Sequence, residues 1–118
     1  MTARERRQAR DAAVRVLIVC GVISDIVEAG EAAFLRDVRT QWAAEMGLIR
    51  IGETVNKIPV AVRERFPGQP WRQIIDMRNF AAHQYDDLDP RRVWRTLKRD
   101  VPALGDYLQH TVIPGLET

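Results

Sequence analysis

The sequence has little material for covalent cross-links, metal sites or membrane spans. It contains one cysteine, Cys20, and two histidines. A lone cysteine cannot form an internal disulfide, and one cysteine with two histidines cannot supply the four ligands of a usual structural zinc site. No stretch approaches the ~18 consecutive apolar residues of a membrane helix. We therefore expect no metal site, no bound cofactor and no membrane association.

The beginning of the chain does not have the pattern of a secretion signal. Residues 14–23 come nearest to an apolar block, but Arg15 interrupts it and Asp25 follows. A cleavable signal needs an uninterrupted apolar segment that ends in small residues. The sequence therefore predicts a cytoplasmic protein.

The length and composition are those of one globular domain. The chain has 118 residues, of which 46% are hydrophobic and 29% are charged. Domains usually contain ~100–200 residues, so a cofactor domain beside a substrate domain would not fit. We expect a single domain over residues 1–118, with flexible ends in the Arg-rich start (1–10) and the tail (110–118).

The charge is modest in amount but unusual in kind. The net charge is +2, and only Lys57 and Lys98 among the 18 basic residues are lysines. Arginine carries a planar, multi-donor group that suits phosphate and carboxylate. A GC-rich genome also favours arginine codons, and we prefer that explanation, so bulk charge alone does not indicate nucleic-acid binding.

Apolar residues recur at helical spacing in four stretches. The first runs from Ala9 to a stop at Gly30, and the second covers residues 37–57. The third begins near Trp71. The fourth begins at residues 89–90, where Asp89 can cap the helix and proline suits its first position. It continues to residue 108.

Prolines divide the rest of the chain. Pro59 and the prolines of residues 67–70 interrupt the helices, with a short helical turn between them. Pro102 should kink the last helix or restart it with Asp100 as a cap. No stretch alternates apolar and polar residues between turn signals, so no strand is expected. The sequence predicts one all-α domain, a four- to five-helix bundle.

Residues 78–85 are the one stretch where polar groups gather inside an apolar helix. Asn79 and His83 are four residues apart and share a face, whereas Arg78 and His83 lie about 140° apart around the axis and roughly 7.5 Å along it. Arg78 would have to curl around the helix to share a ligand with His83. Alternatively, a second copy of the helix could face the first, and each would supply groups to one cleft.

Arginine and histidine together suit cleavage of RNA. Histidine, with an ordinary pKa of about 6.5, can take and give protons near neutrality, and arginine stabilises charge on a phosphoryl group. RNA carries its own nucleophile, the 2′-hydroxyl, so a base, an acid and a cation suffice. The structural alternative is a satisfied Arg78–His83 pair on a buried helix. Tyr85 taken alone is typical of an interfacial aromatic residue.

Gly52 and Glu53 form a second notable pair. A glycine inside a helix costs ~1 kcal/mol relative to alanine and usually permits a close helix approach. Glu53 is expected on a buried face, where it needs a cation, and Arg78 is the candidate partner. The pair would either fix the helix register, which we favour, or orient Arg78 toward a phosphate.

These residues resemble a known family. Arg78, the polar Asn79, three further residues and His83 match the Arg–polar–x–x–x–His signature of the HEPN superfamily. With Tyr85 they match the Arg-x-x-x-x-His-x-Tyr form of the HepT-like toxins of HEPN–MNT toxin–antitoxin systems. The likeness extends over residues 11–108 and includes residues 51–57, 70–75, 93–94 and 100–104.

The resemblance implies a fold, an activity and a regulator. It implies a homodimeric HEPN bundle, with two motif helices beside a shared cleft, and a metal-independent endoribonuclease used as a toxin. Arg78 and His83 would be the catalytic pair, supported by Asn79. Tyr85 would be the residue that a minimal nucleotidyltransferase antitoxin adenylylates, which blocks phosphate binding by charge and volume.

Two other readings remain open. The chain could be a non-catalytic nucleotide-binding subunit of a nucleotidyltransferase pair, with Arg78 and His83 holding a triphosphate. It could also be a small helical DNA-binding regulator, although no basic recognition helix follows a glycine turn.

Overall fold

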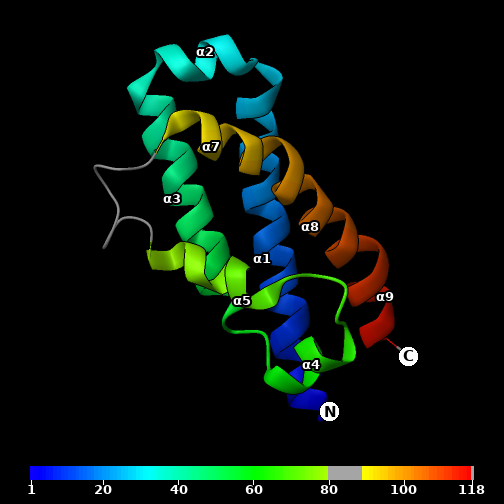
Figure 1. The fold of residues 1–118 in the computed structure, drawn as a ribbon. Helices are drawn as coiled ribbons and strands as arrows, with labels where there is room; N and C mark the ends of the chain where they lie inside the picture. The colour runs from blue at the N-terminus through cyan, green and yellow to red at the C-terminus, as the bar shows by residue number, and fades with distance from the viewer. Residues whose placement is uncertain (80–88, 118) are drawn as a thin grey trace.

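Two long antiparallel helices form the frame of the fold. In the computed structural model, which describes residues 1–79 and 89–117, α1 covers Ala3–Glu28 and α3 covers Val38–Val55. They lie side by side along the length of the molecule (Figure 1). Between them Gly30 has a φ of +96°, a conformation that favours glycine. The two predicted helices and the stop at Gly30 are confirmed.

The ends of the chain are helical. α1 begins at Ala3 rather than near Ala9, because Thr2 and Glu5 form a reciprocal capping box. Arg10 on α1 forms an ion pair of 2.5 Å with Glu117, which follows the last helix. Most of residues 1–10 and 110–118, for which flexibility is predicted, therefore lie in helices that this ion pair links.

A short helix, α2 (Glu31–Arg36), joins α1 to α3 and is not predicted from the sequence. Its Phe34 is buried, and the centre of the Phe34 ring lies 5.5 Å from the centre of the Trp94 ring. The helix thus closes one end of the core (Figure 1). Its six residues contain one continuous apolar run, residues 32–35, which shows no helical period. The spacing of apolar residues therefore did not predict this helix.

Three short segments follow α3, near the end of the bundle opposite α2 (Figure 1). They are α4 (Val60–Arg65), α5 (Trp71–Asp76) and the 3₁₀ turn η1 (Met77–Asn79). α4 confirms the helical turn predicted between Pro59 and residue 67. α5 confirms the start predicted near Trp71. The remainder of that predicted helix lies outside the described residues.

The C-terminal part forms one long curved helix (Figure 1). It comprises α7 (Pro90–Arg95), the π-helical η3 (Thr96–Asp100), α8 (Val101–Tyr107), the π-helical η4 (Leu108–Val112) and α9 (Ile113–Leu116). Asp89 caps it as predicted, since its carboxylate accepts a 2.9 Å hydrogen bond from the Arg91 backbone N–H.

Of the two outcomes predicted for Pro102, a kink or a restart, the restart with Asp100 as a cap is wrong. Asp100 has helical backbone angles and caps nothing with its side chain. A proline inside a helix lacks an N–H and clashes with the carbonyl four residues earlier. Here the wider π-turn absorbs the proline, and the Val101 N–H donates to the Thr96 carbonyl instead. The same device precedes Pro114, where the Ile113 N–H donates to the Leu108 carbonyl.

The core lies between α1, α3 and the C-terminal helix, and the fold class is confirmed as all-α. The part of the chain that the structure describes contains helices and no strand. Buried aliphatic side chains from all three helices fill the interior, among them Val16, Leu48 and Leu104. Within the same residues, no helix is long and apolar enough to span a bilayer.

Candidate active site

Arg78 and Asn79 lie at the end of η1, on the surface of the molecule. Both side chains are exposed. The other two residues of the predicted motif, His83 and Tyr85, lie outside the described residues. The structure therefore bears on how the chain presents Arg78, and on what surrounds it.

We call α5 together with η1 the Arg78 segment. At Gly52 the backbone of α3 touches the backbone of this segment. A Cβ atom placed on Gly52 would lie 2.7 Å from the Arg78 backbone nitrogen and 2.8 Å from the Ile74 carbonyl oxygen. Cβ atoms do not approach other atoms so closely, so only glycine permits this packing. The predicted role of Gly52 in a close helix approach is confirmed. The close approach at Gly52 therefore determines where the Arg78 backbone lies.

Hydrogen bonds anchor the other end of α5. The Trp71 indole Nε1 donates to the Phe66 carbonyl at 2.8 Å, and the Gly68 backbone N–H donates to the Tyr107 hydroxyl at 2.9 Å. The rings of Trp71 and Tyr107 lie 6.1 Å apart. The loop before α5 is thus tied to α8, which leaves the Arg78 segment held at both ends.

The predicted burial of Glu53 is wrong. Glu53 is exposed, and within the described residues it forms no ion pair with Arg78. Gly52 faces α5, and the next side chain around a helix points about 100° away from it. Glu53 instead lines a hollow of about 640 Å³ between α1 and α3, together with Arg15, Arg50 and Lys57.

A smaller hollow separates the Arg78 segment from the C-terminal helix. Its volume is about 200 Å³. Met77, which precedes Arg78, lines one wall, and Thr96 and Asp100 of η3 line the other. The Arg78 segment and η3 therefore face each other across an open groove.

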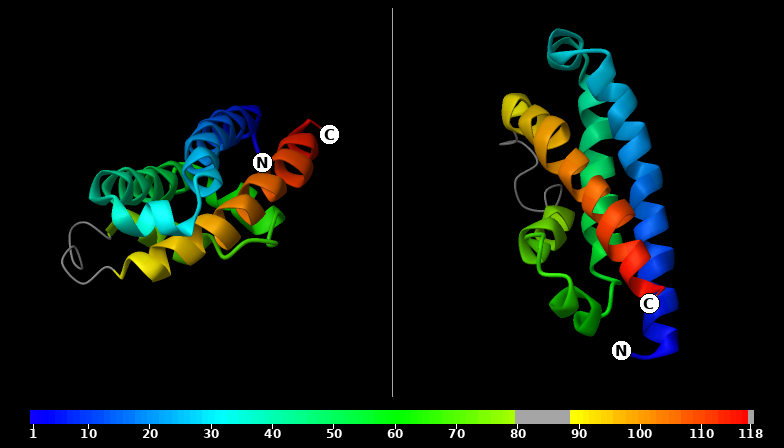
Figure 2. Two further views of the ribbon diagram at one scale, coloured as in Figure 1. Left: turned by 90° about the horizontal axis from the view of Figure 1, so that it is seen from above. Right: turned by 90° about the vertical axis from the view of Figure 1, so that its right-hand side faces the viewer.

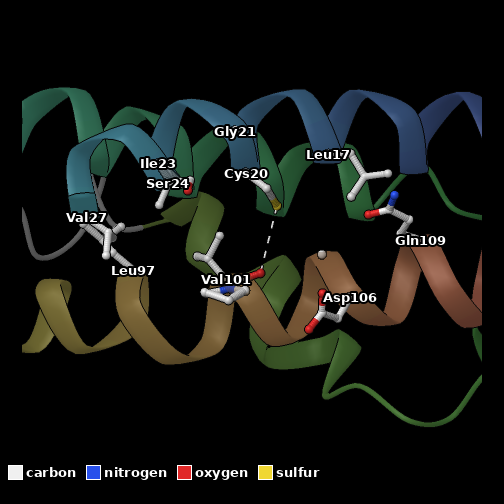
Figure 3. Close-up of a pocket in the computed structure, with 12 residues that line it drawn as sticks. Leu17, Cys20, Gly21, Ile23, Ser24, Val27, Leu97, Val101, Asp106 and Gln109 are labelled. Atoms are coloured by element: carbon white, nitrogen blue, oxygen red, sulfur yellow. Dashed lines mark hydrogen bonds between the residues drawn. The ribbon is translucent and has the colours of Figure 1, made fainter.

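The hollow around Cys20 does not have the chemistry of an active site. It lies between α1 and η3–α8, has a volume of about 400 Å³, and is lined largely by apolar residues (Figure 3). The Cys20 Sγ donates a long, 4.0 Å contact to the Val101 carbonyl. Burial raises the pKa of the Cys20 thiol to about 11. The thiol is thus protonated near neutral pH, which makes it a poor nucleophile.

One charged feature of the surface is absent from the sequence interpretation. Five basic residues in nine, Arg91, Arg92, Arg95, Lys98 and Arg99, are all exposed on α7 and η3. We call this surface the basic face. No acidic residue lies between Asp89 and Asp100. This series of basic residues without an acidic one is the sequence signal that could have identified the basic face.

Comparison with known proteins places the chain in a family. The model of a family described as "Ribonuclease HepT-like" matches residues 4–111. The chain belongs to the HepT-like ribonuclease family. The resemblance seen in residues 78–85 and in the helical segments is therefore confirmed at the level of the family.

Individual HepT-like relatives are similar over part of their length. "Probable ribonuclease HepT" of Thermococcus cleftensis is 39% identical over 71 residues, which are 60% of this chain and 64% of the relative. "Putative RNase MJ0125" of Methanocaldococcus jannaschii is 35% identical over 84 residues, 71% of this chain and 72% of the relative. No solved structure matches the chain significantly.

Substitution of Gly52 tests the close approach that places Arg78. We expect Gly52→Ala to lower the free energy of unfolding by about 1–3 kcal/mol, because the added methyl group meets backbone atoms that cannot turn aside. Gly21→Ala is the matched control, since Gly21 is exposed on α1 with nothing within 4 Å of an added Cβ. It should raise stability by up to ~1 kcal/mol. Urea unfolding followed by circular dichroism measures both, and equal effects would contradict the proposed contact.

Proposed function

We propose that this protein is an endoribonuclease in which Arg78 and His83 form the catalytic pair. His83 serves as base or acid, and Arg78 holds the phosphate. The 2′-hydroxyl loses its proton and attacks the neighbouring phosphorus, the bond to the 5′-oxygen breaks, and that oxygen takes up a proton. The products are a 2′,3′-cyclic phosphate and a 5′-hydroxyl. This route needs no metal ion, because RNA supplies the nucleophile.

Two observations support this proposal. The chain belongs to the HepT-like ribonuclease family, and Arg78 is exposed at the end of a segment that is anchored from both sides. Asn79 follows it on the same surface. Glu53 points into the hollow between α1 and α3, so only Asn79 is proposed in a supporting role.

Replacement of each histidine in turn tests the catalytic claim. We expect His83→Ala to abolish RNA cleavage and growth arrest, because the only proposed proton-transfer group is lost. His110→Ala is the matched control: His110 is exposed on η4 and has no assigned role. Cleavage is measured in EDTA with detection of 2′,3′-cyclic phosphate ends. Full toxicity of His83→Ala would refute the proposal, and ATP binding without cleavage would favour a nucleotide-binding subunit.

We further propose that the protein is the toxin of a toxin–antitoxin pair. A nucleotidyltransferase antitoxin would transfer AMP from ATP to the Tyr85 hydroxyl, with pyrophosphate as the leaving group. The added phosphodiester places a negative charge two residues from His83. It would repel the phosphate of RNA and also occupy its space.

The two tyrosines of the chain allow a clean test of this modification. Coexpression with the nucleotidyltransferase should add whole AMP units to the intact mass of the wild type and of Tyr107→Phe, and none to Tyr85→Phe. Tyr107 is a suitable control because its hydroxyl is already engaged by the Gly68 N–H. Tyr85→Phe should also stay toxic when coexpressed. An unchanged mass increment in Tyr85→Phe would exclude this residue.

We also propose that the active form is a homodimer assembled through the outer side of α1 and α3. Apolar residues at four-residue spacing stay exposed there, and we call them the apolar face: Val14, Ile18, Val22, Val38, Trp42 and Met46. Ile18 is 65% exposed and Trp42 is 56% exposed. Ile18 and Met46 line the same hollow, so the two rows are continuous. Grouped exposure of this kind marks an interface.

The charges beside the apolar face favour a second copy as the occupant. Beside the apolar face, α1 carries Arg15 near its middle and Asp25 and Glu28 in its last turns. An antiparallel second copy related by a two-fold axis would place Arg15 of each copy near the acidic turns of the other. The hollow beneath the face also reaches Glu53. The second copy would therefore sit next to the Arg78 segment.

A charge placed on the apolar face should separate the subunits. We expect Ile18→Asp to convert a dimer into a monomer in light scattering coupled to size exclusion, because the charge would be buried without a partner. Val60→Asp is the control: Val60 is 58% exposed but lies on α4, apart from this face. Circular dichroism verifies that both variants fold. A dimer that survives Ile18→Asp would contradict this interface.

A further inference from the structure

The basic face is directed away from the core along its whole length. On α7 and η3 the buried side chains are Val93, Trp94 and Leu97. At about 100° per residue, Arg92, Arg95 and Arg99 fall on the side opposite the buried residues, and the exposed Arg91 and Lys98 flank them. They extend over roughly 12 Å of helix axis. This is about three to four phosphate spacings of a stacked strand.

Within the residues that the structure describes, these cations have no partner in the same chain. Among residues 1–79 and 89–117 the one ion pair joins Arg10 and Glu117, and no basic-face side chain takes part in a hydrogen bond or ion pair. The acidic Asp89 at the start of the run is occupied with capping α7. Five like charges within nine residues repel one another, so the face is complementary to an anion with several charges.

The basic face borders the groove beside Arg78. Thr96 lines that groove opposite Met77, and Arg92 lies one helical turn before Thr96, whose hydroxyl donates to the Arg92 carbonyl at 3.3 Å. Arg99 directly precedes Asp100, another residue of the groove. A chain of phosphates lying on the basic face would therefore lead into the groove and on to Arg78.

We propose that the basic face of α7 and η3 is the track for the phosphate backbone of single-stranded RNA. This inference rests on the ribonuclease function proposed above and names the surface that holds the substrate on one side of the scissile bond. Four of the five cations are arginines, which form two hydrogen bonds with one phosphate. The face carries no exposed aromatic residue, which predicts binding through the backbone without sequence preference.

An acidic protein surface is the competing partner, and the shape of the face favours RNA. The five cations lie on the outward side of a single helix without the large exposed apolar residues that a protein interface places at its centre. Those residues gather on α1 and α3 instead. A narrow, purely charged strip matches a polyanion better than a folded partner.

The experiment compares two triple variants with the same charge. Arg92→Gln/Arg95→Gln/Arg99→Gln removes three cations from the basic face, and Arg4→Gln/Arg6→Gln/Arg7→Gln removes three exposed ones from the start of α1. Both change the net charge from +2 to −1. The two sites lie near opposite ends of the molecule (Figure 1). Melting temperatures verify that both variants fold.

The probe is a fluorescent 20-nucleotide RNA with 2′-O-methyl groups throughout. It has no free 2′-hydroxyl and cannot be cut by the proposed chemistry, so anisotropy reports binding alone. We expect the basic-face variant to bind at least tenfold more weakly, and the slope of log affinity against log salt to fall by about 2, at ~0.7 per phosphate contact of a single strand. The α1 variant should stay within about twofold of the wild type.

Cleavage of the unmodified RNA separates this inference from the function on which it rests. Weaker binding by the basic-face variant supports the track even if the wild type cuts no RNA, in which case only the proposed function fails. Equal losses in both triple variants would overturn the track in favour of bulk charge. Unchanged RNA binding with lost binding to the nucleotidyltransferase would overturn it in favour of a protein interface.

Discussion

The place of Arg78 depends on a contact between two backbones. Gly52 lets the last turn of α5 and the start of η1 lie directly against α3, at a separation that no side chain would permit. Ile51 and Val55, on either side of Gly52 in the sequence, are buried in the core. Because the Arg78 side chain is long and flexible, the place of its backbone limits the region that the guanidinium can reach. The hydrogen bonds of Trp71 and Tyr107 restrain the other end of the segment.

Helices that could be predicted from the sequence are those whose signals are local. Asp89 caps α7 because an aspartate before a proline satisfies backbone N–H groups within its own turn. Gly30 ends α1 because the required φ lies in a region that favours glycine. Pro102 was misleading for the opposite reason. Whether a proline breaks a helix depends on whether neighbouring turns can widen, and the packing of Val101 and Leu104 in the core keeps this helix continuous.

The site itself shows how far a motif can be interpreted. Residue types and spacing were enough to assign Gly52 its packing role, which the structure confirms, whereas the catalytic role of Arg78 stays a prediction. For Glu53 the sequence predicted burial and an ion pair with Arg78, and both predictions are wrong. Gly52 occupies the contact with α5, so the Glu53 side chain points toward solvent. The basic face escaped notice for a different reason. Arginines are abundant throughout this chain, and only the fold shows which of them share one exposed surface.

The apolar face and the basic face lie on different elements of the fold. The apolar face belongs to α1 and α3, whereas the basic face belongs to the C-terminal helix, which runs along one side of that helix pair (Figure 2). A second copy on the apolar face would therefore leave the basic face open. Arg78 lies between the two, because its backbone touches α3 beside Glu53 and its segment faces η3 across the small groove. A codon preference explains arginine instead of lysine. It does not explain why five cations share one outer side of one helix, next to that groove, while the exposed apolar residues collect on α1 and α3.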